Sequence, residues 1–287
     1  INANVCAARF IENAEQCSLY RVHAVPDPIK LEELGLDLRG VGLSLPKGIP
    51  QPIVFKRLLD ELGQRSNGWL YQQLILRSMQ QAVYTPKNQG HFGLGLERYM
   101  HFTSPIRRYP DLLVHRAIKA ILRGDLSRLP GLDQLEDFGE RCSSLERRAE
   151  SAGWTVEAWL KCDLLKHRTG DTFSGTIAGV TEFGLFVDIE GYFVQGLLHI
   201  SDLGADYFRF ERSQQCLVGE RNGKRYGLGD RIQVLVANVE PAQGKIDLRR
   251  VGGGAKPDGF KSNKGIKQSN KSAGKASKKH RRGRRSA

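Results

Sequence analysis

Apolar residues recur every three or four positions over most of the first half of the chain, a spacing that predicts helices with one buried face. The expected elements are an opening helix, a short strand at 19–23, a surface connection with a short helix at 30–52, helices at 55–62 and 70–83, and a helix after Pro110. Pro86 ends the helix expected at 70–83, since proline cannot continue a helix. The first half is therefore predicted to be mainly helical.

A long helix is predicted next, because apolar positions step by three and four without a break. They are Leu135, Phe138, Cys142, Leu145, Ala149, Ala152, Val156 and Trp159. This narrow seam fits packing across the preceding helices of the same domain, and it also fits a coiled-coil dimer. We expect packing within the domain, because Ala149 and Ala152 suit close helix contact and the polar face carries mixed charge.

Near Gly170 the period changes from about 3.6 to 2, the alternation of half-buried strands. Five strands are predicted, near 173–177, 184–189, 194–200, 231–239 and 245–248. Five short strands in so small a segment fit a closed barrel of the OB type. The fold class is thus α+β, a helical part followed by a five-stranded β-barrel.

Composition limits the class of protein. The 287 residues are 40% hydrophobic, enough for an ordinary core, and neither a long apolar run nor a secretory leader is present. Five cysteines, at 6, 17, 142, 162 and 216, lack the spacing of a zinc site and suggest reduced thiols of a cytoplasmic protein. The chain begins with Ile1 rather than Met, so we expect a fragment of a longer protein.

The net charge of +13 indicates a polyanionic partner, and its location matters more than its size. From Lys256 to Arg285 there are twelve Lys or Arg residues and one acidic residue, Asp258, so this tail supplies +11 of the total. It has few hydrophobic residues and is predicted to be disordered and to bind nucleic acid without sequence preference. The rest of the chain therefore carries little net charge, and any cationic surface on it must be confined to a small region.

The most specific stretch runs from His101 to Arg116. Ser104-Pro105 resists helix formation and Pro110 starts a helix, which places Arg107 and Arg108 on a turn just ahead of a helix N-terminus. Guanidinium groups beside free backbone N–H groups favour a phosphate. An exposed arginine pair with no ligand is the alternative interpretation.

The residues from Thr103 to Leu112, followed by His115-Arg116, closely resemble the signature that ends the catalytic domain of the ribonuclease II/ribonuclease R family, or RNB family. Further matches lie at 3–10, 76–84 and 91–96, and the resemblance covers about residues 1–251. By resemblance, Arg107 is the catalytic residue and stabilises charge on the phosphate at the scissile bond. Ser104, Arg108 and Arg116 are implied to hold the RNA backbone or to support the turn.

The barrel resembles the S1 RNA-binding motif, through Phe183-Gly-Leu-Phe186-Val, Gly196-Leu-Leu-His199-Ile-Ser and Gly229-Asp-Arg-Ile-Gln-Val. Phe183 and Phe186 are implied to stack on bases, with His199 and Lys245 as polar and phosphate contacts. Strict alternation would put the two Phe on opposite faces unless the chain bends between them. The division expected is RNB catalytic domain, C-terminal part, 1–168; S1 barrel, 169–251; basic tail, 252–287.

The resemblance implies a processive 3′-to-5′ exoribonuclease that releases nucleoside 5′-monophosphates and needs Mg²⁺. The family's metal-binding aspartates and cold-shock barrels precede the matched region, so we expect no metal ligands here and no hydrolysis by the isolated chain. The chain also has Trp154-Thr155-Val156 where relatives usually have Arg-Asp-Val. The expected partner is RNA, with the ribosome or RNA-degradation machinery as further candidates, no membrane, and a monomeric state. A non-enzymatic RNA-binding protein is the alternative.

Overall fold

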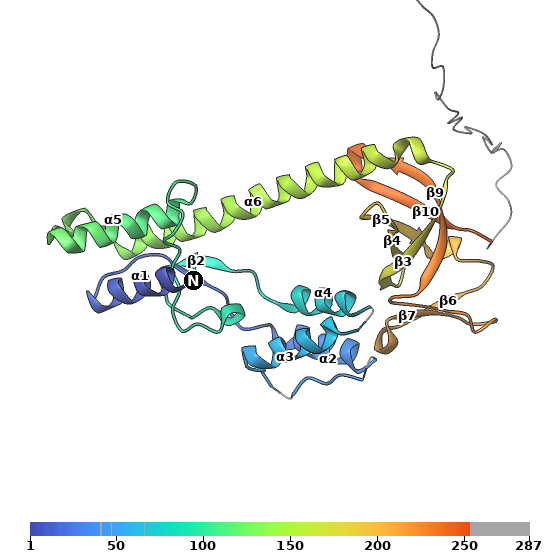
Figure 1. Ribbon diagram of the computed structural model, residues 1–287, viewed down its shortest axis with the longest axis horizontal. Helices are drawn as coiled ribbons and strands as arrows, with labels where there is room; N and C mark the ends of the chain where they lie inside the picture. The colour runs from blue at the N-terminus through green and yellow to red at the C-terminus, as the bar shows by residue number, and fades with distance from the viewer. Residues whose placement is uncertain (41, 47, 66, 253–287) are drawn as a thin grey trace, which may run out of the picture. The chain divides into compact units, whose positions relative to one another are not determined.

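The computed structural model describes residues 1–40, 42–46, 48–65 and 67–252, in which a helical part precedes a β-barrel (Figure 1). The helical part contains α1 (Asn2–Asn13), β1 (Tyr20–Val22), α2 (Pro28–Arg39), α3 (Pro52–Gly63), α4 (Gly68–Ser78), β2 (Val83–Thr85), η1 (Phe92–Leu94), α5 (Tyr109–Arg123), η2 (Leu126–Arg128) and α6 (Leu132–Leu165). The predicted α+β class is confirmed. The predicted tail at 252–287 lies, apart from its first residue, outside the described residues.

The predicted helix at 70–83 is wrong at its C-terminal end. Helix α4 ends at Ser78, and Val83–Thr85 forms strand β2, which pairs antiparallel with β1. A β-branched residue on either side of Tyr84 favours an extended chain, and the pairing buries the Tyr84 ring. The strand predicted at 19–23 corresponds to β1, and β2 is the strand that pairs with it.

Helix α5 begins and ends where its sequence predicts. Pro110 lies in the first turn, and Gly124 ends the helix in the left-handed conformation, with φ of 68°. The inward face of α5 buries Val114 and Ala117 in a core shared with Ala8 and Ile11 of α1. This packing fixes the start of α5, where the Arg107-Arg108 turn joins it.

Helix α6 is one uninterrupted element of 34 residues, as its period predicts (Figure 1). Its beginning packs on β2, where Leu135 is 1% exposed, and near its end Cys162 belongs to the barrel core. Between these ends the seam is bare, and Trp154 and Trp159 are 59% and 49% exposed. The expectation that the whole seam packs on preceding helices is therefore wrong for its middle, because no described element lies over that stretch.

The barrel is closed in the strand order β10-β5-β4-β3-β9, which confirms the five-stranded prediction. Its elements, with an inserted sheet of β6 to β8, are η3 (Lys166–Arg168), β3 (Thr172–Thr181), β4 (Gly184–Ile189), β5 (Val194–His199), η4 (Ile200–Asp202), β6 (Phe208–Glu211), η5 (Arg212–Gln214), β7 (Cys216–Gly219), β8 (Arg225–Gly227), β9 (Arg231–Glu240), η6 (Pro241–Gln243) and β10 (Lys245–Arg250). Alternate residues fill the interior, as Leu185 and Val187 do on β4. Gly196 leaves room for Leu248, whose side chain would lie 2.7 Å from an added Cβ.

The three-stranded sheet β6-β7-β8 was not predicted. Its strands span only three or four residues each, too few to show a period.

All five cysteines are free. Among the described residues, no helix has the length and apolar character needed to cross a membrane.

Candidate nucleic-acid interface

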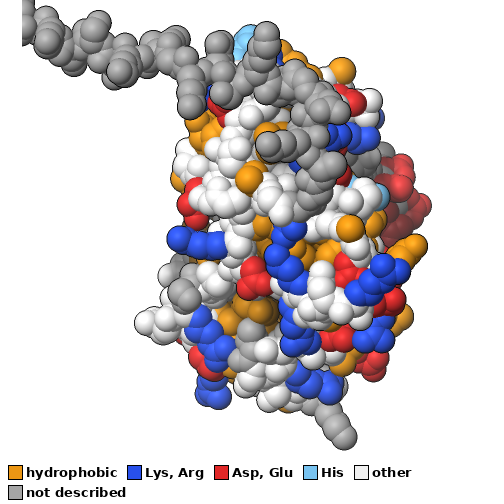
Figure 2. Space-filling view, turned by 90° about the vertical axis from the view of Figure 1, so that its right-hand side faces the viewer, with side chains coloured by type: hydrophobic (Ala, Val, Ile, Leu, Met, Phe, Trp, Pro, Cys, Tyr) orange, Lys and Arg blue, Asp and Glu red, His pale blue; other side chains and the backbone are white. Residues whose placement is uncertain are grey.

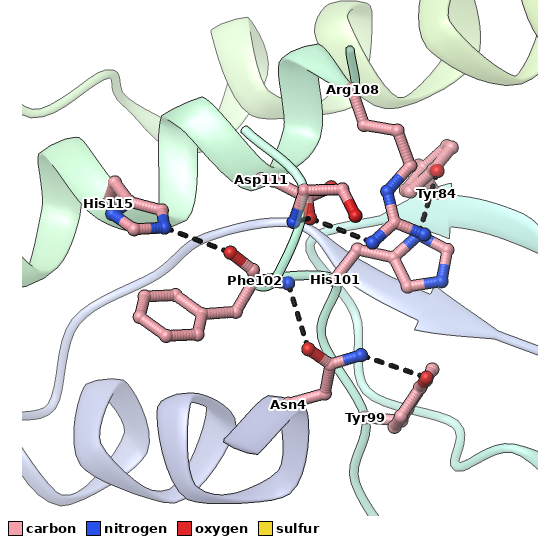
Figure 3. Close-up of polar contacts among 9 residues, drawn as sticks. Asn4, Tyr84, Tyr99, His101, Phe102, Arg108, Asp111 and His115 are labelled. Carbon is pink, nitrogen blue, oxygen red and sulfur yellow. Dashed lines mark hydrogen bonds and ion pairs between the residues drawn. The ribbon is translucent and has the colours of Figure 1, made fainter. Parts of the chain in front are cut away.

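The turn ahead of α5 is held together by one buried carboxylate. Asp111 is 0% exposed, and its Oδ1 accepts hydrogen bonds from the Ser104 backbone N–H at 2.7 Å and from Arg108 Nη2 at 2.8 Å (Figure 3). The Arg108 backbone N–H also donates to the Ser104 carbonyl at 3.0 Å. A charge-assisted pair and two backbone hydrogen bonds thus fix the turn from Ser104 to Arg108.

The two arginines of this turn have different surroundings. Arg108 is 22% exposed and bound to Asp111, whereas Arg107 is exposed and has no side-chain hydrogen bond or ion pair with any described residue. Arg108 is therefore committed to the protein, and Arg107 is free to take a ligand. Arg108 Nε and Asp111 Oδ2 are buried without a partner among the described residues.

A row of aromatic side chains lies next to the turn. His101 Nδ1 lies 2.9 Å from the Tyr84 hydroxyl (Figure 3). The rings of Tyr99 and His91 continue the row through edge contacts. Burial, reinforced by Arg108, lowers the pKa of His101 to about 4. Burial, with His23 beside it, lowers the pKa of His91 to about 4 as well. Both imidazoles are therefore neutral at physiological pH.

Helices α1 and α5 hold the segment that leads into the turn. Asn4 accepts from the Phe102 backbone N–H at 3.1 Å and donates to the Tyr99 hydroxyl at 2.9 Å. His115 Nε2 lies 2.9 Å from the Phe102 carbonyl, and its ring stacks on the Phe102 ring at 4.2 Å (Figure 3). The loop is thus carried on two packed helices and is not a free surface segment. Nothing in the sequence pointed to Asn4, because an asparagine in an opening helix is common.

Arg116, the remaining predicted residue of α5, does not join this turn. Its exposed side chain lines a separate cleft between α5 and α6, together with Lys119 and Arg123.

The barrel brings three of its four predicted residues together on one outer face. Phe183 lies in the two-residue turn between β3 and β4, is 50% exposed, and its ring meets that of Phe186 edge-on at 6.0 Å. His199 pairs with Gly184 across the β4–β5 ladder, which places it beside this aromatic pair. The chain bends at Phe183, so strand alternation does not separate the two rings. Figure 2 shows Lys and Arg side chains spread over the side of the molecule that carries the barrel, with hydrophobic side chains exposed between them.

Lys245 lies elsewhere on the barrel. It begins β10, where its Nζ donates to Gln243 at 2.8 Å and its carbonyl faces Cys162 of α6. The parallel pairing of β10 with β5 sets Asp247 opposite Leu197, and this register puts Arg249 level with His199. Arg249 is 57% exposed, forms a long ion pair with Asp202 at 3.8 Å, and is the better placed cation for an RNA strand lying on the aromatic pair.

A second aromatic cleft was missed by the sequence analysis. It lies between α4, α6 and the β4–β5 turn, has a volume of about 660 Å³, and is lined by Trp69, Phe193, Arg77 and Lys161. Phe193 is 91% exposed and has a positive φ of 52°, a strained conformation for an aromatic residue. Tyr192-Phe193 follows a glycine, which was the available signal for a turn.

No group of three or more His, Cys, Asp or Glu side chains within the described ranges is arranged to hold a metal ion. Asp111 is taken up by Arg108 and Ser104, so it is a structural acceptor and not part of a metal site. The donor set present does not fit Mg²⁺, which prefers carboxylate oxygens and water.

Comparison with known proteins agrees with this geometry. The RNB domain family matches residues 1–124 and the S1 RNA binding domain family matches residues 166–250. Ribonuclease R of Escherichia coli (strain K12) is 43% identical over 259 residues, which cover 86% of this chain and 32% of that protein. The apo form of Mycoplasma genitalium RNase R matches with a TM-score of 0.78 and 27% identity, over 88% of this chain and 40% of that one. Its complex with ribose methylated single-stranded RNA matches with a TM-score of 0.77, at 28% identity and the same coverage.

The chain thus contains one stretch that matches the RNB domain family and a second that matches the S1 RNA binding domain family. Over most of its length it is similar to ribonuclease R. The chain spans about a third of the length of the relatives that it matches, 32% in the case of the E. coli protein.

Proposed function

We propose that this chain is the RNA-gripping C-terminal portion of a processive 3′-to-5′ exoribonuclease that releases nucleoside 5′-monophosphates. One observation carries the proposal: in a homologue of ribonuclease R, Arg107 is exposed and unpaired within the described residues, on a turn that Asp111 fixes from below. The turn fixes the backbone of Arg107, and its unpaired guanidinium can pair with the charge that develops on a phosphate.

The roles of the neighbouring residues follow from their contacts. We assign Asp111 and Arg108 as positioning residues, because their side chains contact each other and the turn. Ser104 supports the turn through its backbone. In the complete enzyme Mg²⁺ would supply the activated water, and carboxylates outside the described residues would hold it. We therefore expect RNA binding and no hydrolysis by this chain alone.

The barrel supplies the second contact with RNA in this proposal. Phe183 and Phe186 offer ring faces to bases, while His199 and Arg249 offer polar and cationic contacts to the backbone. The complex of the M. genitalium relative with single-stranded RNA supports this role. Lys245 and the cleft of Trp69 and Phe193 are candidates for further contacts along the same strand.

A non-enzymatic RNA-binding protein that acts through the barrel and the basic tail is the second candidate. Reading the coding DNA upstream of Ile1 separates the two. An in-frame segment with several closely spaced aspartates supports the enzyme, whereas a stop codon supports the binder. In either case we propose a cytoplasmic monomer whose partner is RNA, either free or as part of the ribosome or of the RNA-degradation machinery.

The chain mixed with a 3′-tailed RNA and Mg²⁺ tests the proposal. We expect saturable binding in a fluorescence anisotropy titration and no mononucleotides by chromatography. Arg107→Gln should weaken binding about fivefold, the loss of one charge-assisted contact. Arg9→Gln, at another exposed arginine, should change it by less than about twofold. Release of mononucleotides would overturn the predicted inactivity, and equal binding by both variants would overturn the role of Arg107.

A further inference from the structure

A cleft of about 620 Å³ lies between the outer side of α5, the η2 loop and the beginning of α6. Its charged lining residues are Arg116, Lys119, Arg123, Arg128 and Asp125. Its volume is within the range of about 300–1,000 Å³ that is usual for small-molecule sites. Four cations against one carboxylate make it a site for an anion.

The cations of α5 have no partners of their own. Arg116, Lys119 and Arg123 are spaced by three and four residues, so they share one helix face, and none has an ion pair or side-chain hydrogen bond with a described residue. Like charges at this spacing destabilise a helix unless an anion lies between them. The helix dipole offsets this cost for Arg123, in the last turn, but not for Arg116. Asp125 is already engaged by Ser127 and Arg128.

The cleft also has an aromatic wall. Tyr109 is 44% exposed and stands edge-on to Phe138 at 5.9 Å, and both rings line the cleft. The apolar side chains of Leu113 and Leu129 lie beside them. Cations next to an exposed ring are the arrangement that holds a phosphate and a base together.

We propose that this cleft binds a nucleotide, with its phosphate on Arg116, Lys119 and Arg123 and its base against Tyr109. The site is distinct from the Arg107 turn, because Arg107 and Arg108 do not line it. The inference rests on the lining of the cleft and holds whether or not the chain is part of a nuclease. The nucleotide can be free or a unit of an RNA chain.

Titration of the 287-residue chain with adenosine 5′-monophosphate, followed by calorimetry, tests the site. We expect saturable binding that Lys119→Gln with Arg123→Gln weakens about tenfold, through the loss of two charge-assisted contacts. A matched pair of exposed cations on α1 and α3, changed as Arg9→Gln with Lys56→Gln, should leave it within about twofold. The basic tail is present in every variant, so its contribution to binding is the same in all of them and does not affect the comparison. No saturable binding, or equal loss in both pairs, overturns the proposal.

Further ligands separate the contributions. Inorganic phosphate should bind more weakly than adenosine 5′-monophosphate, and Tyr109→Leu should remove that difference; phosphate binding as tight as the nucleotide would overturn the base contact. A short oligoribonucleotide that loses affinity in the Lys119/Arg123 variant identifies an RNA chain as the source, whereas one that does not identifies the free nucleotide. Variants of Arg107 should leave nucleotide binding unchanged, so failure of this site and failure of the proposed function give different results.

Discussion

Asp111 is the residue on which the turn ahead of α5 depends, because one carboxylate oxygen serves both the backbone of Ser104 and the guanidinium of Arg108. Its burial removes competition from water, and its loss leaves a partly buried arginine without its counter-ion. A residue that touches no substrate thus decides where Arg107 is presented.

Replacing this carboxylate should destabilise the protein. We expect Asp111→Ala to lower the free energy of unfolding by about 3 kcal/mol, since both bonds to its oxygen are lost, and Asp111→Asn by about half as much. Urea unfolding followed by circular dichroism measures both. Asp133→Asn, at an exposed carboxylate in the first turn of α6, should stay within about 0.5 kcal/mol. Equal effects at the two positions would contradict the role of Asp111.

The buried imidazoles should make stability fall in mild acid. Burial lowers the pKa of His91 and of His101 from about 6.5 to about 4. Below pH 6.5 the unfolded chain therefore binds more protons than the folded chain, so stability is complete above that pH and is lost as the pH falls towards 4. With allowance for solvent screening, each histidine should remove about 1 kcal/mol between pH 7 and 5. Denaturant unfolding at each pH measures this, and His101→Gln should flatten the curve; an unchanged slope would count against a neutral, buried His101.

At this scale the sequence located the turn and its cations but could not distinguish the two arginines. Two adjacent arginines look alike in the sequence, and only the position of Asp111, in the first turn of α5, decides which guanidinium is bound. The burial of His101 depends on Tyr84 and Tyr99, which contact it only once the chain has folded. Arg249 was missed for a similar reason, since strand register sets which cation lies level with His199.

Among the elements, α6 meets its neighbours in two different ways along its length. At Gly139 an added Cβ would lie 2.6 Å from the Tyr84 carbonyl oxygen, so β2 and the helix touch backbone to backbone. At Gly153, in the bare stretch, nothing lies within 4 Å of such a Cβ. Gly139 therefore allows close packing of the helix on β2, whereas Gly153 contributes only backbone flexibility.

The two glycines provide a matched pair of substitutions on one helix. Gly139→Ala should lower the free energy of unfolding by about 2 kcal/mol, because backbone must move to admit the methyl group. Gly153→Ala should raise it by about 1 kcal/mol, the difference in helix propensity. Thermal unfolding of the two variants compares them directly. The same sign of change in both would show that the contact between α6 and β2 is not as tight as described.

Elements with a sustained period were predictable, and short ones were not. The long helix and the five barrel strands each repeat their pattern several times. Strand β2 and the sheet of β6 to β8 are too short for that, and they exist because a partner strand is nearby. Phe183 shows the same limit, since a two-residue turn breaks the alternation that the sequence alone would continue.

For the whole molecule, the basic tail and the aromatic pair of the barrel are different parts of the chain. Twelve Lys and Arg residues lie between Lys256 and Arg285, whereas Phe183 and Phe186 meet on the barrel face. In the proposed function the tail would supply attraction that salt screens, and the barrel would supply stacking that salt affects little.

Removing residues 255–287 should separate the two modes. We expect the shortened chain to bind RNA more weakly at low salt, with a shallower dependence of log Kd on log salt concentration, because fewer phosphates are neutralised. Phe186→Ala should still weaken binding by about 1–3 kcal/mol in the shortened chain, the contribution of one stacked base. Tyr207→Ala, at an aromatic residue that is 71% exposed outside the barrel strands, is the control. An unchanged salt slope would show that the tail does not contact RNA.

The continuity of α6 sets a condition on its length. Each residue of an α-helix advances the chain by about 1.5 Å and turns it by about 100°. One residue inserted into the bare stretch near Trp154 would therefore rotate Cys162 and Leu165, the side chains buried in the barrel, out of phase with Leu135 at the other end. Seven inserted residues, close to two full turns, would nearly restore that phase, so insertions of whole turns should disturb this helix less than insertions of single residues.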